Sequence, residues 1–350
     1  MYLRSFGSDN HATVHPRLIE VLSEVNQHQV PSYGTDHWSL EVSKAFEREY
    51  GPKTESFLVF NGTAANVLSL RAMVKNYQSV FCSDVSHLFR DECGAPEVIG
   101  GVKLIPVPSV NGKLTVTELE KLWMRRGDQH FAQTQGISIT QPTEVGTVYS
   151  MEELRELTAW SKQKKLKIHM DGARLSNAAV HLQKNFREFT SDLGVDVVSF
   201  GGSKNGLMLG EAIIFINPAL AEDFRFIRKQ SLQLPSKSRF IAAQFLAYLN
   251  DGLWEELAQS SIGRAQELEE KVRSIPSIQI QYPVDSNAVF AKIPREWVKP
   301  LRESYFFYVW DEKETVCRWM TSWDTTAADV AGFATAITRL SVEKYSGSRA

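Results

Sequence analysis

Residues 197–210 read VVSFGGSKNGLMLG, which places a single lysine, Lys204, on a glycine-rich turn. The apolar run VVSF precedes this turn and the apolar run EAIIFI (211–216) follows it, so we expect a buried strand on either side. A surface loop is the simplest interpretation, because a lysine side chain usually lies in water. The rest of the chain decides between that interpretation and a chemical role for Lys204.

Strand-like and helical runs alternate through the first two thirds of the chain. The strand-like runs are 57–60, 79–83, 103–108, 136–140, 167–171, 197–202 and 211–216, and helical runs such as 63–74 and 150–165 separate them. Helices of this length between short strands predict crossover connections, and hence an α/β fold with a mostly parallel central sheet and helices on both faces. Ligands bind at the carboxyl ends of the strands in such sheets.

The last third of the chain has a different pattern. Two long helical stretches, 217–230 and 238–275, are followed by the strand-like runs IQIQYP, AVFAKIP, YFFYVW and VCRWMTSW and by a helix at 326–340. Strands joined by short turns and flanked by helices predict a smaller α+β C-terminal domain. We place the boundary near residue 245, so that residues 1–245, with an N-terminal segment 1–30, form the large domain and residues 246–350 the small one.

The composition is that of an ordinary globular protein, with 350 residues, 43% hydrophobic and 23% charged. The net charge of −2 and a pI near 6.5 give no basic excess, so neither nucleic acid nor a membrane is expected as a partner. The absence of an 18-residue apolar run and of a secretory signal pattern favours a cytoplasmic location. The three cysteines form no CxxC pair, so neither a disulfide framework nor a metal site is expected.

Two further motifs place polar residues at strand ends. Asn61-Gly62-Thr63 leads from a strand into a helix, where free backbone N–H groups, the Thr63 hydroxyl and the space at Gly62 suit an anion. A plain turn with Thr63 as the helix cap is the alternative. Asp171 ends the strand KIHMD, and its carboxylate requires a partner, either its neighbour Arg174 or a cationic ring nitrogen of a cofactor.

Lys204 follows the next strand-like run after Asp171. An amine at a strand end, among small residues and close to an anion site, suits an imine with an aldehyde cofactor. GGSKNG does not match a nucleotide-binding phosphate loop, because no hydroxyl residue follows the lysine. The glycine turn, the strand-end aspartate and the strand-end lysine, in that order, are more specific together than any one of them alone.

The chain resembles the fold-type I pyridoxal-phosphate enzymes, and within them the low-specificity L-threonine aldolases of the β-eliminating lyase group. The resemblance covers nearly the whole sequence, through SDNHATVHP (8–16), YGTD (33–36), NGTAAN (61–66), SDVSHLFRDECGAPEVIGG (83–101), HFAQTQ (130–135), GTVYSMEELREL (146–157), HMDGARLSNA (169–178), SFGGSKNG (199–206) and RWMTSWDT (318–325). It implies a transferase-like fold, pyridoxal 5'-phosphate as cofactor, and cleavage of L-threonine, L-allo-threonine and related β-hydroxy-α-amino acids to glycine and an aldehyde.

The resemblance also implies a role for individual residues. Lys204 holds the cofactor as an imine and Asp171 pairs with its ring nitrogen. The other implied ligands are Gly62 and Thr63 for the phosphate, His87 stacked on the ring, and Ser8, Arg174 and Arg318 for the substrate carboxylate, with Arg174 also beside the cofactor. A guanidinium fork suits a carboxylate better than a lysine does. Tyr33 falls in the family's substrate region, although a core tyrosine is the alternative.

A retro-aldol cleavage needs a base for the β-hydroxyl proton, and a histidine titrates near neutral pH. His87 is the first candidate and His130 the second. The alternatives are a purely stacking ring for His87 and a surface or helix-cap residue for His130. His37 and His169 are interpreted as structural.

Enzymes of this group build their sites at a dimer interface, so the resemblance implies a homo-oligomer, a dimer of dimers. Four basic residues around QSLQLPSKS could reach a neighbouring subunit's phosphate, and a solvated basic face is the alternative; they are Arg228, Lys229, Lys237 and Arg239.

The sequence departs from the family at ITQPTEVGTVY, where many members carry Glu-Asn-Thr-His-Asn before the Gly-Thr-Val of 146–148, and this indicates a different subgroup. Two same-fold activities remain as alternatives, a β-eliminating lyase and an aminotransferase. A pyridoxal-phosphate-binding carrier or regulator without catalysis is the non-enzyme alternative.

Overall fold

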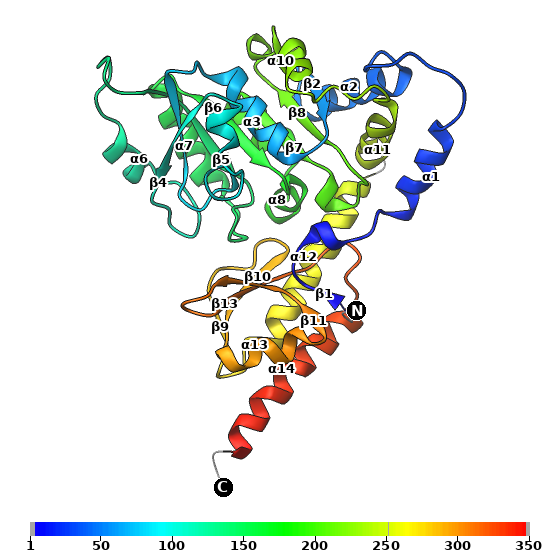
Figure 1. Ribbon diagram of the computed structural model, residues 1–350, viewed down its shortest axis with the longest axis vertical. Coiled ribbons are helices and arrows are strands. Elements are labelled where there is room, and N and C mark those ends of the chain that lie inside the picture. The colour runs from blue at the N-terminus through cyan, green and yellow to red at the C-terminus, as the bar shows by residue number, and fades with distance from the viewer. Residues whose placement is uncertain (1–3, 251, 348–350) are drawn as a thin grey trace.

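The computed structural model of the protein describes residues 4–250 and 252–347. Its largest sheet has seven strands in the order β2-β8-β7-β6-β5-β3-β4 (Figure 1). Within this sheet β8 runs antiparallel to both of its neighbours and all other pairs are parallel, which confirms the predicted mostly parallel central sheet. The strands are β2 (Glu55–Val59), β3 (Gln78–Ser83), β4 (Lys103–Val107), β5 (Gln133–Thr140), β6 (Lys167–Gly172), β7 (Val197–Gly201) and β8 (Glu211–Phe215).

Each face of this sheet carries its own hydrophobic core, because successive residues of a strand point to opposite faces. Val198 and Phe200 pack into the core that contains α2 and α11, whereas Val197 packs into the core that contains α3. The predicted helices on both faces are thus confirmed. The helices of this part are α1 (Pro16–Val25), α2 (His37–Tyr50), α3 (Gly62–Met73), α4 (His87–Arg90), α5 (Ala95–Val98), α6 (Val116–Leu122), α7 (Met151–Gln163), α8 (Leu175–Leu182), α9 (Phe186–Phe189), α10 (Phe224–Gln230) and α11 (Arg239–Asn250).

A second, antiparallel sheet with the order β12-β13-β10-β9 lies in the lower part of Figure 1. Its strands are β9 (Gln279–Ile280), β10 (Ala288–Lys292), β12 (Tyr308–Asp311) and β13 (Val316–Met320), and α12 (Leu253–Val272), α13 (Arg295–Arg302) and α14 (Ala327–Gly347) accompany it. Along α12, Leu257 packs in one core of the large sheet whereas Leu268 packs in the core of this second part. The division into domains at residue 245 stays a prediction.

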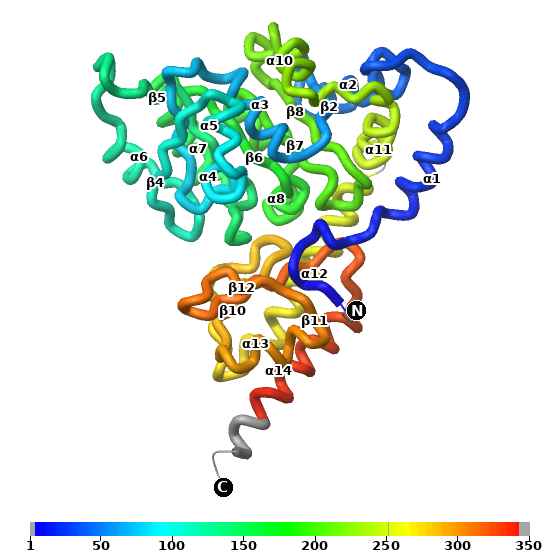
Figure 2. Tube along the Cα trace, in the orientation of Figure 1, coloured from blue at the N-terminus to red at the C-terminus, as the bar shows by residue number. Residues whose placement is uncertain are grey.

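The N-terminal segment lies against the second part (Figure 2). Its strand β1 (Arg4–Ser5) pairs in parallel with β11 (Tyr305–Phe306), and Phe6 is buried in the second core. The residues that follow, Gly7 to His11, therefore run between the two parts of the molecule before α1 begins.

Several helices differ from their predicted extent. The stretch 238–275 forms two helices, because Gly252 before α12 has a φ of 68° that interrupts the helical conformation. The stretch 217–230 contains a short 3-10 turn, Pro218–Leu220, and then α10. The periodicity did not predict α1 or α2, although Asp36 caps α2 by accepting a hydrogen bond from Ser39 N at 2.9 Å.

Across the described residues, no helix is both long and apolar enough to cross a membrane. The same residues contain no cluster of three His, Cys, Asp or Glu side chains arranged to hold a metal ion.

Candidate active site

Lys204 lies in a short 3-10 turn, Ser203–Asn205, directly after β7. We call residues 201–206 the Lys204 turn. Its glycines are required by close packing: a Cβ on Gly201 would lie 2.2 Å from the carbonyl oxygen of Ala173, and a Cβ on Gly202 would lie 2.5 Å from the Leu207 side chain. Gly206 closes the turn with a φ of 101°, which favours glycine. The fold therefore holds the lysine backbone in one place.

Glu211, the first residue of β8, is buried beneath the Lys204 turn. Its Oε2 accepts a hydrogen bond from Gly202 N at 2.9 Å. Burial raises the pKa of Glu211 to about 7, although hydrogen bonds from Gly202 and Ser203 and the charge of Lys204 act in the opposite direction. Sequence reasoning missed this residue, and the signal was a single carboxylate at the start of an otherwise apolar strand.

Asp171 lies at the carboxyl end of β6, the strand next to β7, and its side chain is buried. Its Oδ2 accepts a hydrogen bond from Asn66 Nδ2 at 3.0 Å and its Oδ1 accepts one from Ala173 N at 3.1 Å. The carboxylate is thus fixed at the same edge of the sheet as Lys204.

Arg174 pairs with Asp9 and not with Asp171, which corrects the salt bridge considered from the sequence. Arg174 Nε lies 2.6 Å from Asp9 Oδ2 and Arg174 Nη2 lies 2.9 Å from Asp9 Oδ1. Burial alone would raise the pKa of Asp9, but the charge and hydrogen bonds of Arg174 outweigh it and the pKa is lowered. Asn287 Nδ2 also donates to Asp9, at 3.1 Å. Asp9 therefore fixes the guanidinium of Arg174.

Arg318 on β13 faces the same region from the second sheet. Its Nη2 donates to the carbonyl oxygen of Gly7 at 2.9 Å, and its guanidinium carbon lies 5.5 Å and 5.4 Å from the ring centres of Tyr308 and Trp310. Burial, followed by the like charge of Arg174, lowers the pKa of Arg318. Within the described residues its buried Nε has no hydrogen-bond partner. A buried donor on a cation next to a second cation suits a carboxylate ligand.

Ser8 lies between the contacts of these two arginines, since Gly7 bonds to Arg318 and Asp9 bonds to Arg174. Its Oγ accepts a hydrogen bond from Asn10 N at 3.2 Å and caps the short 3-10 turn Asp9–His11. The structure thus brings Ser8, Arg174 and Arg318 together from three distant parts of the sequence.

Gly62 and Thr63 begin α3 directly after β2, at the edge of the sheet that also carries Asp171 and Lys204. Asn61, and not Thr63, caps the helix, because its side chain accepts a hydrogen bond from Ala64 N at 2.9 Å. A Cβ on Gly62 would meet no atom within 4 Å, so the helix start is open. An open helix N-terminus suits a phosphate.

His87 begins α4, after β3, and its Nδ1 lies 2.8 Å from Glu92 Oε1. The Glu92 side chain has no exposed surface, and its Oε1 also accepts from Asn66 Nδ2 at 3.1 Å. The hydrogen bond to Glu92 raises the pKa of His87 against the effect of burial, and the charges of Glu144 and Asp171 act in the same direction. Sequence reasoning missed Glu92 and Asn66, although both lie inside quoted motifs.

A model of the β-eliminating lyase family matches residues 5–295. This chain belongs to that family. It is 39% identical to the low specificity L-threonine aldolase of Pseudomonas sp. (strain NCIMB 10558) over 93% of this chain and 95% of that protein. It is 27% identical to the Saccharomyces cerevisiae enzyme of the same name over 77% of this chain and 68% of that one.

Solved structures agree with this membership of the β-eliminating lyase family. The Leishmania major threonine aldolase superposes with a TM-score of 0.91 at 26% identity, over 97% of this chain and 99% of that one. An aromatic aminotransferase from Pyrococcus horikoshii superposes with a TM-score of 0.72 at 16% identity, over 98% of this chain and 96% of that one, and supports the fold alone. The fold-type I architecture expected from the sequence is therefore confirmed.

His130 and Tyr33, the second candidate base and a candidate substrate residue, are both exposed in the single chain. His130 is exposed and precedes β5, so it lies at the amino end of the strands, opposite to Asp171; its backbone N donates to Asp128 Oδ1 at 2.9 Å. Tyr33 is also exposed, its backbone N donates to Ser236 O at 2.9 Å, and Lys229 Nζ lies 5.5 Å from its ring centre. The roles of His130 and Tyr33 stay predictions.

The basic residues around QSLQLPSKS do not form one solvated face. Arg228 turns inward, where its Nη1 donates to Leu58 O at 3.3 Å and burial lowers its pKa to about 10. Arg239 Nη1 donates to His28 O at 3.1 Å. Lys229 lies with Tyr33, as described above, and shares the open surface with it.

His169 has the structural role expected of it. Its ring nitrogens lie 2.8 Å from Ser138 Oγ and 2.9 Å from Ser199 Oγ, and burial lowers its pKa to about 3. A neutral, hydrogen-bonded imidazole in the middle of the sheet holds three neighbouring strands together.

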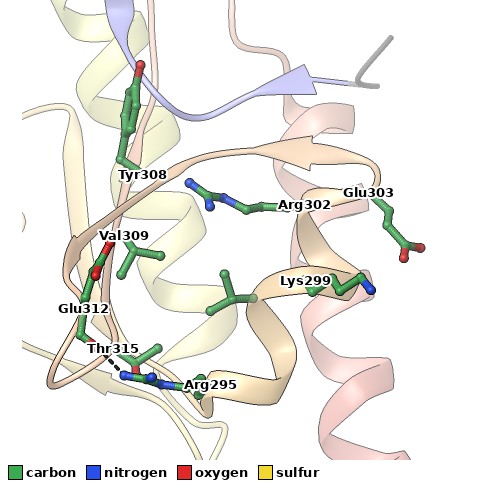
Figure 3. A pocket seen from close by; sticks show the side chains of 9 residues that line it. Arg295, Lys299, Arg302, Glu303, Tyr308, Val309, Glu312 and Thr315 are labelled. Atoms are coloured by element: carbon green, nitrogen blue, oxygen red, sulfur yellow. Dashed lines mark hydrogen bonds between the residues drawn. The ribbon is translucent and has the colours of Figure 1, made fainter.

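A separate hollow of about 780 Å³ lies between α13 and β12 (Figure 3). Arg295, Lys299 and Arg302 line it, and Arg302 Nε donates to Phe307 O at 2.8 Å. None of the residues predicted for the site lines this hollow. Of its lining residues, Tyr308 also contacts Arg318, whose guanidinium carbon lies 5.5 Å from the Tyr308 ring centre.

Proposed function

We propose that this protein is a pyridoxal-phosphate-dependent aldolase that cleaves L-threonine, L-allo-threonine and related β-hydroxy-α-amino acids to glycine and an aldehyde. The observation that carries the proposal is the position of Lys204 after β7, beside Asp171 at the end of β6. The two relatives described above, which are named low specificity L-threonine aldolases, support the same activity.

The residues at this edge of the sheet fit pyridoxal phosphate. Lys204 would hold its aldehyde carbon covalently, Asp171 its ring nitrogen, and the start of α3 its phosphate. His87 would stack on the ring. When bound, the cofactor supplies an electron sink for the bonds at the substrate Cα.

The arginines orient the substrate. Arg318 offers its unpartnered Nε to the substrate carboxylate, and Ser8 and the remaining donors of Arg174 lie beside it. Because Asp9 already occupies Nε and one Nη of Arg174, we assign the larger part of carboxylate binding to Arg318. Fixing the carboxylate determines which bond at Cα lies in the orientation to break.

His87 is the proposed base. Its Nδ1 faces Glu92, so Nε2 is the atom that accepts the proton of the β-hydroxyl. As that proton leaves, the oxygen forms the carbonyl group of the aldehyde, the Cα–Cβ bond breaks, and its electron pair stays with Cα. A proton then adds to Cα and completes glycine.

The test compares two substrates. Purified protein with bound cofactor is incubated with L-threonine and, separately, with an amino acid that carries a leaving group on its β-carbon. We expect glycine and acetaldehyde from threonine. Pyruvate and ammonia from the second substrate, without acetaldehyde from the first, would replace the aldolase by a β-eliminating lyase. A protein that binds the cofactor but turns over neither substrate nor a keto acid would be a carrier or regulator.

We propose that the enzyme is a homo-oligomer, a dimer of dimers whose sites are shared between subunits. Support comes from large apolar side chains that are exposed in a single chain, including Phe226, Leu232 and Tyr33. A groove of about 410 Å³ beside α1, lined in part by Ile19 and Met208, is a further partly apolar surface of the single chain. A second copy of this chain would cover these residues.

Subunit sharing is testable by mixing variants. We expect Lys204→Ala and Lys229→Ala to be inactive alone and to regain activity when dissociated and reassociated together, because one site of the mixed dimer would have both lysines. If the mixture is as inactive as either variant alone, the site is not shared between subunits.

We further propose a cytoplasmic location and a division into domains near residue 245. The three cysteines are free, and two of them, Cys82 and Cys317, are buried thiols, as is usual in a reducing compartment. The change of core along α12 supports two domains joined by that helix.

A further inference from the structure

The segment between α4 and α5 turns one carboxylate inward. Glu92 is buried, whereas its neighbours Asp91 and Cys93 are exposed. Cys93 and Gly94 have φ values of 51° and 72°, and this local turn directs Glu92 under His87. An ionised side chain in such a position requires partners, since burial without them is unfavourable.

Glu92 has those partners. His87 Nδ1 lies 2.8 Å from its Oε1, and Asn66 Nδ2 donates to the same oxygen at 3.1 Å. Burial would raise the pKa of Glu92, but hydrogen bonds from His87, Thr63 and Asn66 outweigh it and the pKa is lowered. Glu92 therefore stays ionised beside the imidazole.

Asn66 extends this contact to the cofactor-binding carboxylate. Its Nδ2 also donates to Asp171 Oδ2 at 3.0 Å, so one buried amide lies between two buried carboxylates. The result is a continuous chain, His87–Glu92–Asn66–Asp171, that draws on three separate segments of the sequence. The amide donates to one oxygen of each anion, and the His87 ring supplies a compensating positive charge whenever it is protonated.

We propose that Glu92 is a positioning residue for His87: it binds Nδ1, leaves Nε2 directed to the substrate hydroxyl, and stabilises the imidazolium that forms when Nε2 takes the proton. Through Asn66 it also links that charge to Asp171. The inference rests on the proposed function, because that function makes His87 the base.

Three acidic groups from different elements face the His87 ring. They are Glu92, from the segment after α4, Glu144, from the segment after β5, and Asp171, at the end of β6. Glu92 is the one in hydrogen-bond contact, so removing its charge should change His87 most.

The test substitutes Glu92→Gln, which keeps the size of the side chain and removes its charge. In cofactor-free protein, we expect the NMR titration of the His87 ring to move to lower pH. In the loaded enzyme, kcat should fall about 10- to 100-fold with KM little changed, and the acid limb of the kcat/KM profile should move to lower pH. Glu97→Gln, an exposed carboxylate on α5, is the matched control and should change none of these.

An unchanged His87 titration, or an unchanged kcat, would overturn the proposal. If Glu92→Gln fails to fold, the tautomer of His87 in the wild-type protein tests the proposal instead. Nitrogen NMR should find the neutral His87 ring protonated at Nδ1. A neutral ring protonated only at Nε2 would overturn the proposal. Failure of the aldolase assay would refute the function, and the titration of cofactor-free protein would still report whether Glu92 controls His87.

Discussion

The Lys204 turn belongs to the proposed active site, and the surface around Tyr33 and Leu232 belongs to the proposed subunit interface. The two differ in how tightly they are packed within a single chain. In the Lys204 turn a single added Cβ on Gly201 would approach the Ala173 carbonyl oxygen to 2.2 Å. By contrast, Leu232 is 84% exposed, Phe226 59% and Tyr33 51%. The Lys204 turn is tightly packed by residues of its own chain. The surface around Tyr33 and Leu232 exposes apolar side chains that a second chain would cover. The two should therefore respond differently to substitution.

The largest effect is expected from Lys204→Ala. Loss of the amine removes the covalent link to the cofactor, so we expect a colourless protein whose activity is lower by at least about 10⁴-fold, with an unchanged circular dichroism spectrum. Lys184→Ala is the control, because the partly exposed Lys184 pairs with Glu188 at 2.9 Å and has no proposed role in the site. A yellow Lys204→Ala protein would show that another lysine holds the cofactor.

Gly201→Ala and Gly62→Ala separate the effects of packing and of cofactor binding at the edge of the sheet that carries Lys204. The alanine at 201 would collide with backbone, and we expect about 3 kcal/mol of lost stability in chemical denaturation. The alanine at 62 meets nothing within 4 Å, so stability should change by less than about 1 kcal/mol while cofactor affinity falls, because the methyl group enters the phosphate space. Equal stabilities for the two variants would contradict the packing described here.

The sequence predicted the residues that follow strands. Asp171 lies at the carboxyl end of a strand, and Lys204, Gly62 and Thr63 lie within four residues after one; the carboxyl ends of parallel strands share one edge of the sheet. The alternation of strand-like and helical runs was sufficient to predict that these residues lie together, because the fold class alone determines where the strand ends meet.

Contacts between distant segments could not be predicted in this way. Asp9 and Arg174 are 165 positions apart, and no periodicity indicates that they pair. Glu92 looks like an exposed residue in a charged stretch, and only the turn at Cys93 and Gly94 buries it. The sequence also gives no sign that Tyr33 is exposed in a single chain or that His130 lies at the amino end of the strands, because these positions depend on tertiary packing and on strand direction.

A smaller effect concerns pH and Glu211. Its pKa is raised from 4.5 to about 7 in the folded protein, so the folded state binds the proton more tightly than the unfolded state. Stability is then fully present below about pH 4.5 and is lost as pH rises through about 7, by up to about 3 kcal/mol. Glu211→Gln should remove this part of the pH dependence in cofactor-free protein, measured by denaturation across that window. Parallel curves for the two proteins would refute it.

Leu232→Asp, in the exposed surface around Tyr33 and Leu232, is expected to have the smallest effect on folding. Its effect on assembly should be large. Leu232 makes so little contact within one chain that its replacement should change the stability of the isolated subunit by less than about 0.5 kcal/mol. A charge in a covered apolar interface is unfavourable, so sedimentation should detect smaller particles, and activity should fall with the association state. The matched control is Val98→Asp, which also replaces a highly exposed apolar side chain, but on α5. If Leu232→Asp sediments like the wild type, the surface around Tyr33 and Leu232 is exposed to solvent and is not a subunit interface. The difference in packing between this surface and the Lys204 turn would then carry no information about assembly.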